Sequence, residues 1–208
     1  NSNHCETIFL LGLLEIRNKN LASAKKLFSK IIDIEPLNVR AHNNLGNILK
    51  ELGNNKEAII SFNKIIKIDP KNTNAHYNLG ALFYKIKEIK KAKSFFEKTV
   101  EIQPNYAMAY FNLANISVDL NDFEKAVSFY QKSIEINPKL PSAYNNLGLV
   151  YRNLNDFENS IINYKKSIEI NPNHASSHHN LGIAYKEIGD FDKAIESHQM
   201  AIKCEPEN

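Results

Sequence analysis

The sequence predicts an all-α solenoid of stacked helical repeats, and three observations carry this prediction. Six of the seven prolines recur at an interval of 34 residues, a period typical of stacked repeat units. Apolar residues within one period follow helical spacing, as at Ala143, Leu147 and Val150. Glycine or asparagine recurs mid-period, where a turn between two helices is expected. The periodic prolines are Pro36, Pro70, Pro104, Pro138, Pro172 and Pro206.

Placing each proline at position 32 of its unit defines the repeats. This frame gives six complete repeats that form a single solenoid over residues 5–208. No glycine- or proline-rich linker divides them. The repeats are 5–38, 39–72, 73–106, 107–140, 141–174 and 175–208.

Each repeat is expected to hold two helices. The first ends near position 15, where Gly53, Gly189, Asn121 and Asn155 tolerate the left-handed conformation. Position 16 offers N-caps for the second helix, which the proline then stops because it lacks a backbone N–H. The expected caps are Asn54, Asp122, Asp156 and Asp190.

Small and aromatic columns describe how the two helices pack. Position 8 is glycine in five repeats and Ala114 in the fourth, and position 20 is alanine in five repeats. We expect these small residues to allow close approach of the helices. Position 24 is aromatic in five repeats and His198 in the sixth. Positions 28 and 30 are apolar and are expected to be buried between repeats, with Cys204 as a small core residue.

These columns resemble the tetratricopeptide repeat over residues 5–208. The resemblance implies a right-handed superhelix whose first helices line a concave groove, with positions 2, 5, 6, 9, 12 and 13 facing inward. Residues 43–47 and 145–148 also look like repeats of the O-linked N-acetylglucosamine transferase superhelix. In that superhelix, equivalent asparagines hold the backbone of substrate proteins.

Position 6 carries asparagine in five repeats, although asparagine is unfavourable within a helix. Because an amide both donates and accepts hydrogen bonds, such a ladder could grip the backbone of an extended peptide of any sequence. Two alternatives remain: the amides bond within or between repeats, or they reflect duplication of one unit. The ladder residues are Asn44, Asn78, Asn112, Asn146 and Asn180.

Other positions of the expected groove would give selectivity. The middle repeats present apolar and aromatic side chains, which would anchor a ligand or, alternatively, pack between repeats. Basic residues flank this patch, and asparagine recurs at position 9. The anchor residues are Tyr77, Tyr84, Met108 and Phe111 with Val118, the basic residues are Lys50, Arg152 and Lys186, and the further asparagines are Asn47 and Asn115.

The sequence does not support several other kinds of site. His174, His178 and His179 lack the further ligands that a zinc site needs, so we predict no metal and no cofactor. Neither a phosphate-binding loop nor a nucleophile motif is present. No lysine or arginine stands at position 5 or 6, which excludes the carboxylate clamp of chaperone-binding tetratricopeptide domains. A net charge of +3 gives no strong basic excess for nucleic acid.

The sequence therefore predicts a non-catalytic, cytoplasmic scaffold that binds an extended protein segment and neither nucleic acid nor membrane. One alternative is the substrate-recognition arm of a larger enzyme such as a glycosyltransferase, and another is an RNA-binding helical repeat. The last repeat exposes apolar residues, including Ile195 and Ile202, without a capping helix. We expect either that the natural chain continues past Asn208 or that this end self-associates.

Overall fold

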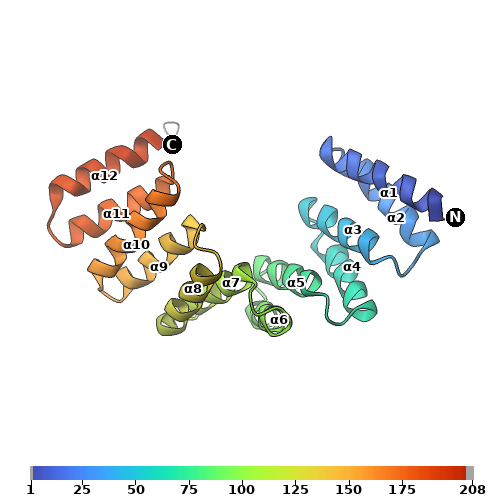
Figure 1. Cartoon of the computed structure of the whole chain (residues 1–208), viewed down its shortest axis with the longest axis horizontal. Coiled ribbons are helices and arrows are strands. Elements are labelled where there is room, and N and C mark those ends of the chain that lie inside the picture. The colour runs from blue at the N-terminus through green and yellow to red at the C-terminus, as the bar shows by residue number, and fades with distance from the viewer. Residues whose placement is uncertain (1, 205–208) are drawn as a thin grey trace. The chain divides into compact units, whose positions relative to one another are not determined.

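The structure is a computed structural model that describes residues 2–204, with side chains from His4 onward. This part of the chain contains twelve α-helices and no strand, which confirms the all-α fold class (Figure 1). The helices are α1 (Ser2–Arg17), α2 (Leu21–Ile34), α3 (Val39–Glu51), α4 (Asn55–Ile68), α5 (Thr73–Lys85), α6 (Ile89–Ile102), α7 (Ala107–Asp119), α8 (Phe123–Ile136), α9 (Pro141–Asn153), α10 (Phe157–Ile170), α11 (Ala175–Glu187) and α12 (Phe191–Cys204).

The chain divides into two compact units, Asn1–Gln103 with α1 to α6 and Pro104–Asn208 with α7 to α12. Within each unit every helix packs on the helix that follows it, as along a stack of helical pairs. Helices α3, α5, α7, α9 and α11 each begin at the first residue of an expected repeat. One continuous solenoid over residues 5–208 stays a prediction, and Pro206 lies outside the described residues.

The turn between the two helices of each pair uses a left-handed residue at position 15. The four expected residues all have positive φ, between 57° at Asn121 and 81° at Gly189. Lys19 (61°) and Lys87 (64°) adopt the same conformation and were missed, because lysine rarely does so. The packing of the helical pair therefore imposes this turn even where the local sequence disfavours it.

Replacing Lys19 with glycine is expected to raise the free energy of unfolding by up to about 1 kcal/mol, because glycine removes the steric cost of positive φ. The control is Lys26→Gly in α2, where the same exchange should lower stability by about 1 kcal/mol. Urea titration followed by circular dichroism measures both. A loss of stability in Lys19→Gly would contradict the strained turn.

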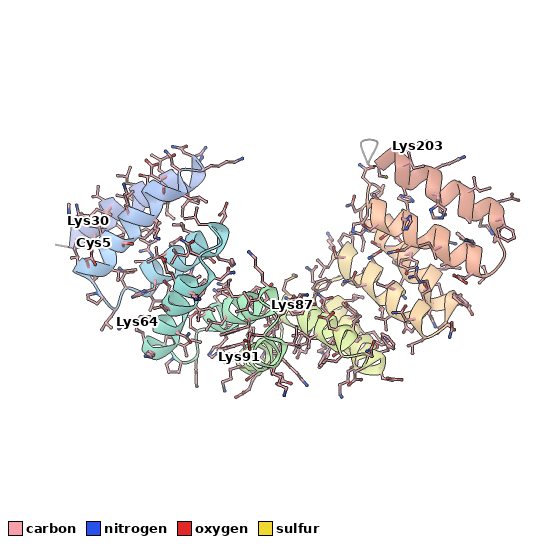
Figure 2. The ribbon with its side chains drawn as sticks, turned by 180° about the vertical axis from the view of Figure 1, so that it is seen from behind. Cys5, Lys30, Lys64, Lys87, Lys91 and Lys203 are labelled. Carbon is pink, nitrogen blue, oxygen red and sulfur yellow. The ribbon has the colours of Figure 1, made fainter. Side chains whose placement is uncertain are left out.

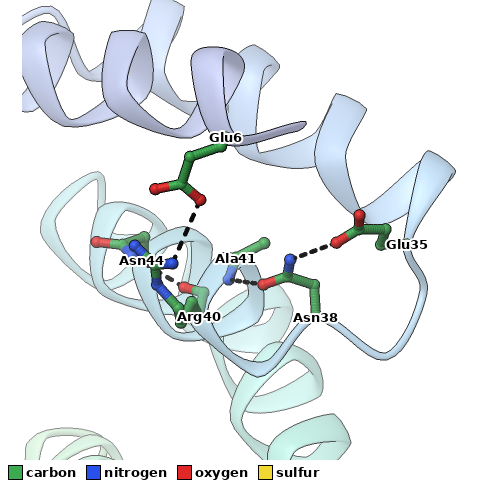
Figure 3. Close-up of polar contacts among 6 residues, drawn as sticks. All are labelled: Glu6, Glu35, Asn38, Arg40, Ala41 and Asn44. Atoms are coloured by element: carbon green, nitrogen blue, oxygen red, sulfur yellow. Dashed lines mark hydrogen bonds and ion pairs between the residues drawn. The ribbon is translucent and has the colours of Figure 1, made fainter. Parts of the chain in front are cut away.

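The N-cap prediction holds at three of its four residues. The side chains of Asp122, Asp156 and Asp190 accept hydrogen bonds from backbone N–H groups three residues later, at 3.3, 3.1 and 3.3 Å. The prediction is wrong for Asn54, whose side chain makes no capping hydrogen bond. Asparagines also cap first helices: Asn38 accepts from the Ala41 N–H at 2.9 Å and donates to Glu35 (Figure 3).

The glycine at position 8 makes room for the aromatic ring at position 24. A Cβ atom on Gly46 would lie 2.7 Å from Cζ of the fully buried Phe62. The same relation joins the Gly12/Phe28, Gly80/Phe96, Gly148/Tyr164 and Gly182/His198 pairs. The sequence placed this column at a close helix crossing, and the structure adds that an aromatic ring fills the space.

The burial expected at positions 28 and 30 is only partial: Ile32, Ile66, Ile134 and Ile168 pack against the core but are not fully buried. The buried column is position 27, which contains Ile31, Ile65, Thr99, Ser133 and Ser167. Residues at positions 28 and 30 lie half-buried or exposed, and Ile202 is 67% exposed. Cys204 is likewise half-exposed rather than a core residue, with its Sγ 3.8 Å from the Pro172 carbonyl.

Position 26 forms a lysine column on the second helices, which includes Lys30 and Lys64 (Figure 2). Three of these lysines pair with a glutamate three residues later: Lys98 with Glu101 (2.7 Å), Lys132 with Glu135 (2.9 Å) and Lys166 with Glu169 (2.7 Å). Lys30 and Asp33 make no ion pair in the described part of the chain. Such exposed pairs contribute well under about 1 kcal/mol each.

Candidate functional site

The candidate site is the set of side chains at positions 2, 5, 6, 9, 12 and 13 of the first helices, here called the first-helix surface. In the first unit its ladder asparagines are Asn44 and Asn78, both half-buried. Asn44 Nδ2 donates to the Arg40 carbonyl one turn back, at 2.9 Å (Figure 3). Asn78 Oδ1 accepts from Lys50 Nζ at 3.1 Å, so this bond joins α3 to α5.

In the second unit two of the three ladder asparagines, Asn146 and Asn180, belong to a hydrogen-bonded network. Asn112 donates to the Met108 carbonyl at 2.8 Å, in the manner of Asn44. Asn146 donates to Asn115 Oδ1 at 3.2 Å, and Asn180 donates to Asn145 Oδ1 at 3.0 Å. These bonds join α7, α9 and α11 to one another through amide side chains.

Asn145, at position 5, is the centre of this network. Its side chain is buried, with 8% exposed. Its Nδ2 donates to Asn146 Oδ1 at 3.1 Å, and its Oδ1 also accepts from the Ser177 hydroxyl at 3.1 Å. The sequence offered no reason to single it out, because Asn43 occupies the same position and forms no such network among the described residues.

Tyr130 ends the network on α8. Its hydroxyl donates to Asn115 Oδ1, which also accepts from Asn146. Burial raises the pKa of Tyr130 to about 12, so this hydroxyl remains protonated and able to donate near neutral pH. The ladder asparagines therefore do bond within and between repeats, as one alternative expected. An amide has two donor hydrogens and two acceptor lone pairs, so these bonds do not exhaust its capacity.

The expected aromatic anchors pack mainly against the aromatic column. Tyr77 meets Phe96 with ring centroids 5.7 Å apart, and Phe111 meets Tyr130 at 5.8 Å. Tyr84 is half-buried and has Lys87 Nζ 5.8 Å from its ring centroid. Met108 is the most open of the four, with 37% exposed. Tyr77 and Tyr84 belong to the first unit, and Met108 and Phe111 belong to the second.

The three cations at position 12 differ in their surroundings. Lys50 is half-buried, and its pKa is lowered first by burial and then by the charge of Lys85. Arg152 is half-buried, and its Nη1 atom is buried without a hydrogen-bond partner among the described residues. Lys186 is exposed. Asn47, at position 9 of α3, is half-buried.

Four histidines make hydrogen-bond contacts within the fold. His42, His76 and His178, at position 4, place Nε2 within 3.0, 3.0 and 2.9 Å of the carbonyls of Pro36, Pro70 and Pro172. His174 Nδ1 lies 2.7 Å from the Ser177 hydroxyl. Within residues 2–204, no group of three or more histidine, cysteine, aspartate or glutamate side chains is placed to hold a metal ion.

Family models of helical repeats match most of the described chain. Models described as tetratricopeptide repeats match residues 140–204, 73–106, 27–60 and 95–128, and one described as a TPR repeat matches residues 46–87 and 114–155. The chain belongs to the tetratricopeptide repeat family. No curated protein sequence matches this chain.

Solved tetratricopeptide structures share the fold. MamA is 27% identical with a TM-score of 0.72, over 78% of this chain and 95% of MamA. PilF from Pseudomonas aeruginosa is 19% identical with a TM-score of 0.86, over 100% of this chain and 94% of PilF. YrrB, a TPR protein with an unusual peptide-binding site, is 23% identical with a TM-score of 0.69, over 87% of this chain and 93% of YrrB. Within residues 2–204 no helix has the length and apolar content needed to cross a membrane.

The tetratricopeptide frame also exposes a contact that sequence reasoning missed. Arg40 and Glu6 both occupy position 2, and Arg40 Nη1 lies 3.4 Å from Glu6 Oε2 (Figure 3). The Arg40 guanidinium also lies 4.0 Å from the ring centroid of Phe9, at position 5. Opposite charges at one inward-facing position of adjacent repeats were the signal that could have revealed this pair.

Proposed function

We propose that this chain is a non-catalytic scaffold that binds an extended protein segment along its first-helix surface. The observation that carries this proposal is the ladder of five half-buried amides at one repeat position. Asparagine within a helix costs several tenths of a kcal/mol relative to alanine, so five repetitions favour a role beyond helix formation. The likeness to MamA and YrrB supports a binding role, since YrrB is described with a peptide-binding site.

The chemistry of the ladder suits recognition of a backbone. An extended peptide presents N–H and C=O groups along its length, and an amide side chain can pair with either. Asn44 uses one N–H internally and keeps a second N–H and its Oδ1 for a ligand. Asn146 and Asn180 are held in place by the network, which orients their amides before a ligand arrives.

To test the proposal, peptides that bind the native chain are selected from a bead-displayed library of random 12-residue peptides. Half of these peptides have a free C terminus and half have an amidated one. The double variant Asn44→Ala/Asn112→Ala should lower the affinity for every selected peptide about tenfold, as expected for the loss of one or two hydrogen bonds. Both residues donate to a carbonyl four residues back, so alanine should leave the helices intact. Fluorescence anisotropy measures the affinities.

Asn163→Ala is the matched control. Asn163 makes the same local bond, to the Asn159 carbonyl at 2.8 Å, but on the second helix α10. Its replacement should leave affinity unchanged. Methylating successive backbone nitrogens of a selected peptide should weaken binding to the native chain and should have a smaller effect on the double variant. Unaltered affinity in the double variant, or failure to select any peptide, would contradict the proposal.

A further inference from the structure

Lys50 is a half-buried cation without an anionic partner. It lies in the last turn of α3, and its Nζ donates to the neutral Asn78 Oδ1 across to α5. An ammonium group has three donor hydrogens, so this bond leaves two for other acceptors. No carboxylate among the described residues lies within ion-pair distance of Lys50. Its charge is therefore partly removed from water and is compensated only by an amide dipole.

A second positive charge acts on Lys50. Lys85 ends α5, and its charge lowers the pKa of Lys50 further after burial has done so. Residues 85–93 contain five lysines and a single acidic residue, Glu88. Glu88 pairs with Lys91 at 3.4 Å, so it does not neutralise Lys85. Among the described residues, neither Lys50 nor Lys85 has a carboxylate within ion-pair distance, so this end of the first-helix surface of the first unit carries two lysines without an ion-pair partner.

Several other cations of the same unit have an acidic partner within the chain, which Lys50 lacks. Arg40 pairs with Glu6, Lys25 pairs with Glu57 at 3.0 Å, and Lys98 pairs with Glu101. The helix dipole favours lysine in a last turn and so accounts for the sign of the charge. It does not account for the partial burial of Lys50 or for its bond across to another helix.

We propose that Lys50 and Lys85, together with Asn78, form an anion subsite that takes a carboxylate of the bound protein segment. This inference rests on the proposed function. It adds sequence selectivity to the asparagine ladder, which would hydrogen-bond the backbone of a peptide of any sequence. The carboxylate comes either from an aspartate or glutamate side chain or from the C terminus of the segment. Binding places the negative charge beside two ammonium groups in a partly desolvated place, where a charge-assisted hydrogen bond is strong.

The experiment uses peptides selected by the native chain from the same library at about 50 mM salt, within the range where charges act strongly. Each selected peptide is remade with Glu→Gln or Asp→Asn exchanges and, separately, with an amidated C terminus. Removing the recognised carboxylate should weaken binding to the native chain about five- to tenfold. The exchange that produces this loss identifies whether a side chain or the C terminus supplies the carboxylate.

Lys50→Gln should lower the affinity for the acidic peptide by the same five- to tenfold. This variant should then bind the acidic and neutral versions of the peptide equally. Lys64→Gln is the control, because it removes one positive charge from the position 26 column and should keep the preference. Lys85→Gln, at the exposed end of α5, tests the subsite independently of any effect of Lys50→Gln on folding. Lys50→Arg keeps the charge and should retain most of the preference.

The outcomes separate the two proposals. If peptides bind but the native chain does not distinguish acidic from neutral versions, the anion subsite is overturned while the scaffold function stands. The anion subsite is also overturned, while the scaffold function stands, if Lys50→Gln and Lys85→Gln both keep the preference of the native chain for the acidic peptide. If no peptide binds to the native chain, the scaffold function and the subsite both fail.

Discussion

Replacing Phe62 with alanine is expected to lower the free energy of unfolding by about 3–5 kcal/mol, the usual loss for truncating a buried phenylalanine. Phe62 is fully buried in the first unit, where it packs with Leu49, Ile65 and Leu79. The glycine opposite it has no side chain to fill the resulting space. Urea titration followed by circular dichroism measures the loss.

Gly46→Ala separates ring packing from helix propensity. In the native background the new Cβ would lie 2.7 Å from the Phe62 ring, so the exchange should cost about 1–2 kcal/mol. In the Phe62→Ala background the clash is gone, and Gly46→Ala should stabilise the helix by about 1 kcal/mol. An equal effect in both backgrounds would show that the ring does not fill the space above Gly46.

Asn145→Ala is expected to lower the free energy of unfolding by about 2–3 kcal/mol. The exchange removes one acceptor shared by Ser177 and Asn180 and one donor to Asn146. Ser177 is fully buried but keeps Ser167 and His174 within hydrogen-bond distance, so the expected loss comes from the three hydrogen bonds of Asn145, each contributing about 1 kcal/mol. The same urea titration provides the measurement.

Asn43→Ala is the matched control, because Asn43 holds position 5 of the second repeat and is only half-buried. It should change stability by no more than about 0.5 kcal/mol, since no described residue forms a hydrogen bond with its side chain. If both variants lose the same stability, the effect belongs to position 5 in general, and the network around Asn145 contributes nothing special.

Much of the fold could be predicted because the same packing of two helices recurs in each repeat. Proline at position 32, glycine at position 8 and the aromatic residue at position 24 are local requirements that recur in register. Burial was harder to predict. The column at position 27 contains isoleucine, threonine and serine, so its hydropathy changes from Ile31 to Ser167 although its burial does not. Hydropathy alone therefore pointed to the more uniform positions 28 and 30.

The candidate site was only partly predictable. Its residues follow from the repeat frame, because a position number places each side chain on the first-helix surface. Their partners do not follow, because a hydrogen bond depends on side chains from two or three helices at once. Asn44 and Asn146 occupy the same position, yet one bonds within its own helix and the other to two neighbouring asparagines.

The sequence by itself determined that the chain is all-α, that each 34-residue period holds a pair of helices, and which asparagines recur at position 6. These properties depend on backbone propensities and on spacing, which are written locally in the chain. Only the tertiary structure decided that Lys19 and Lys87 adopt left-handed turns, that Asn145 joins α9 to α11, and that Lys50 meets a neutral amide. Those outcomes depend on which side chains the packed helices bring together and on how much water they exclude.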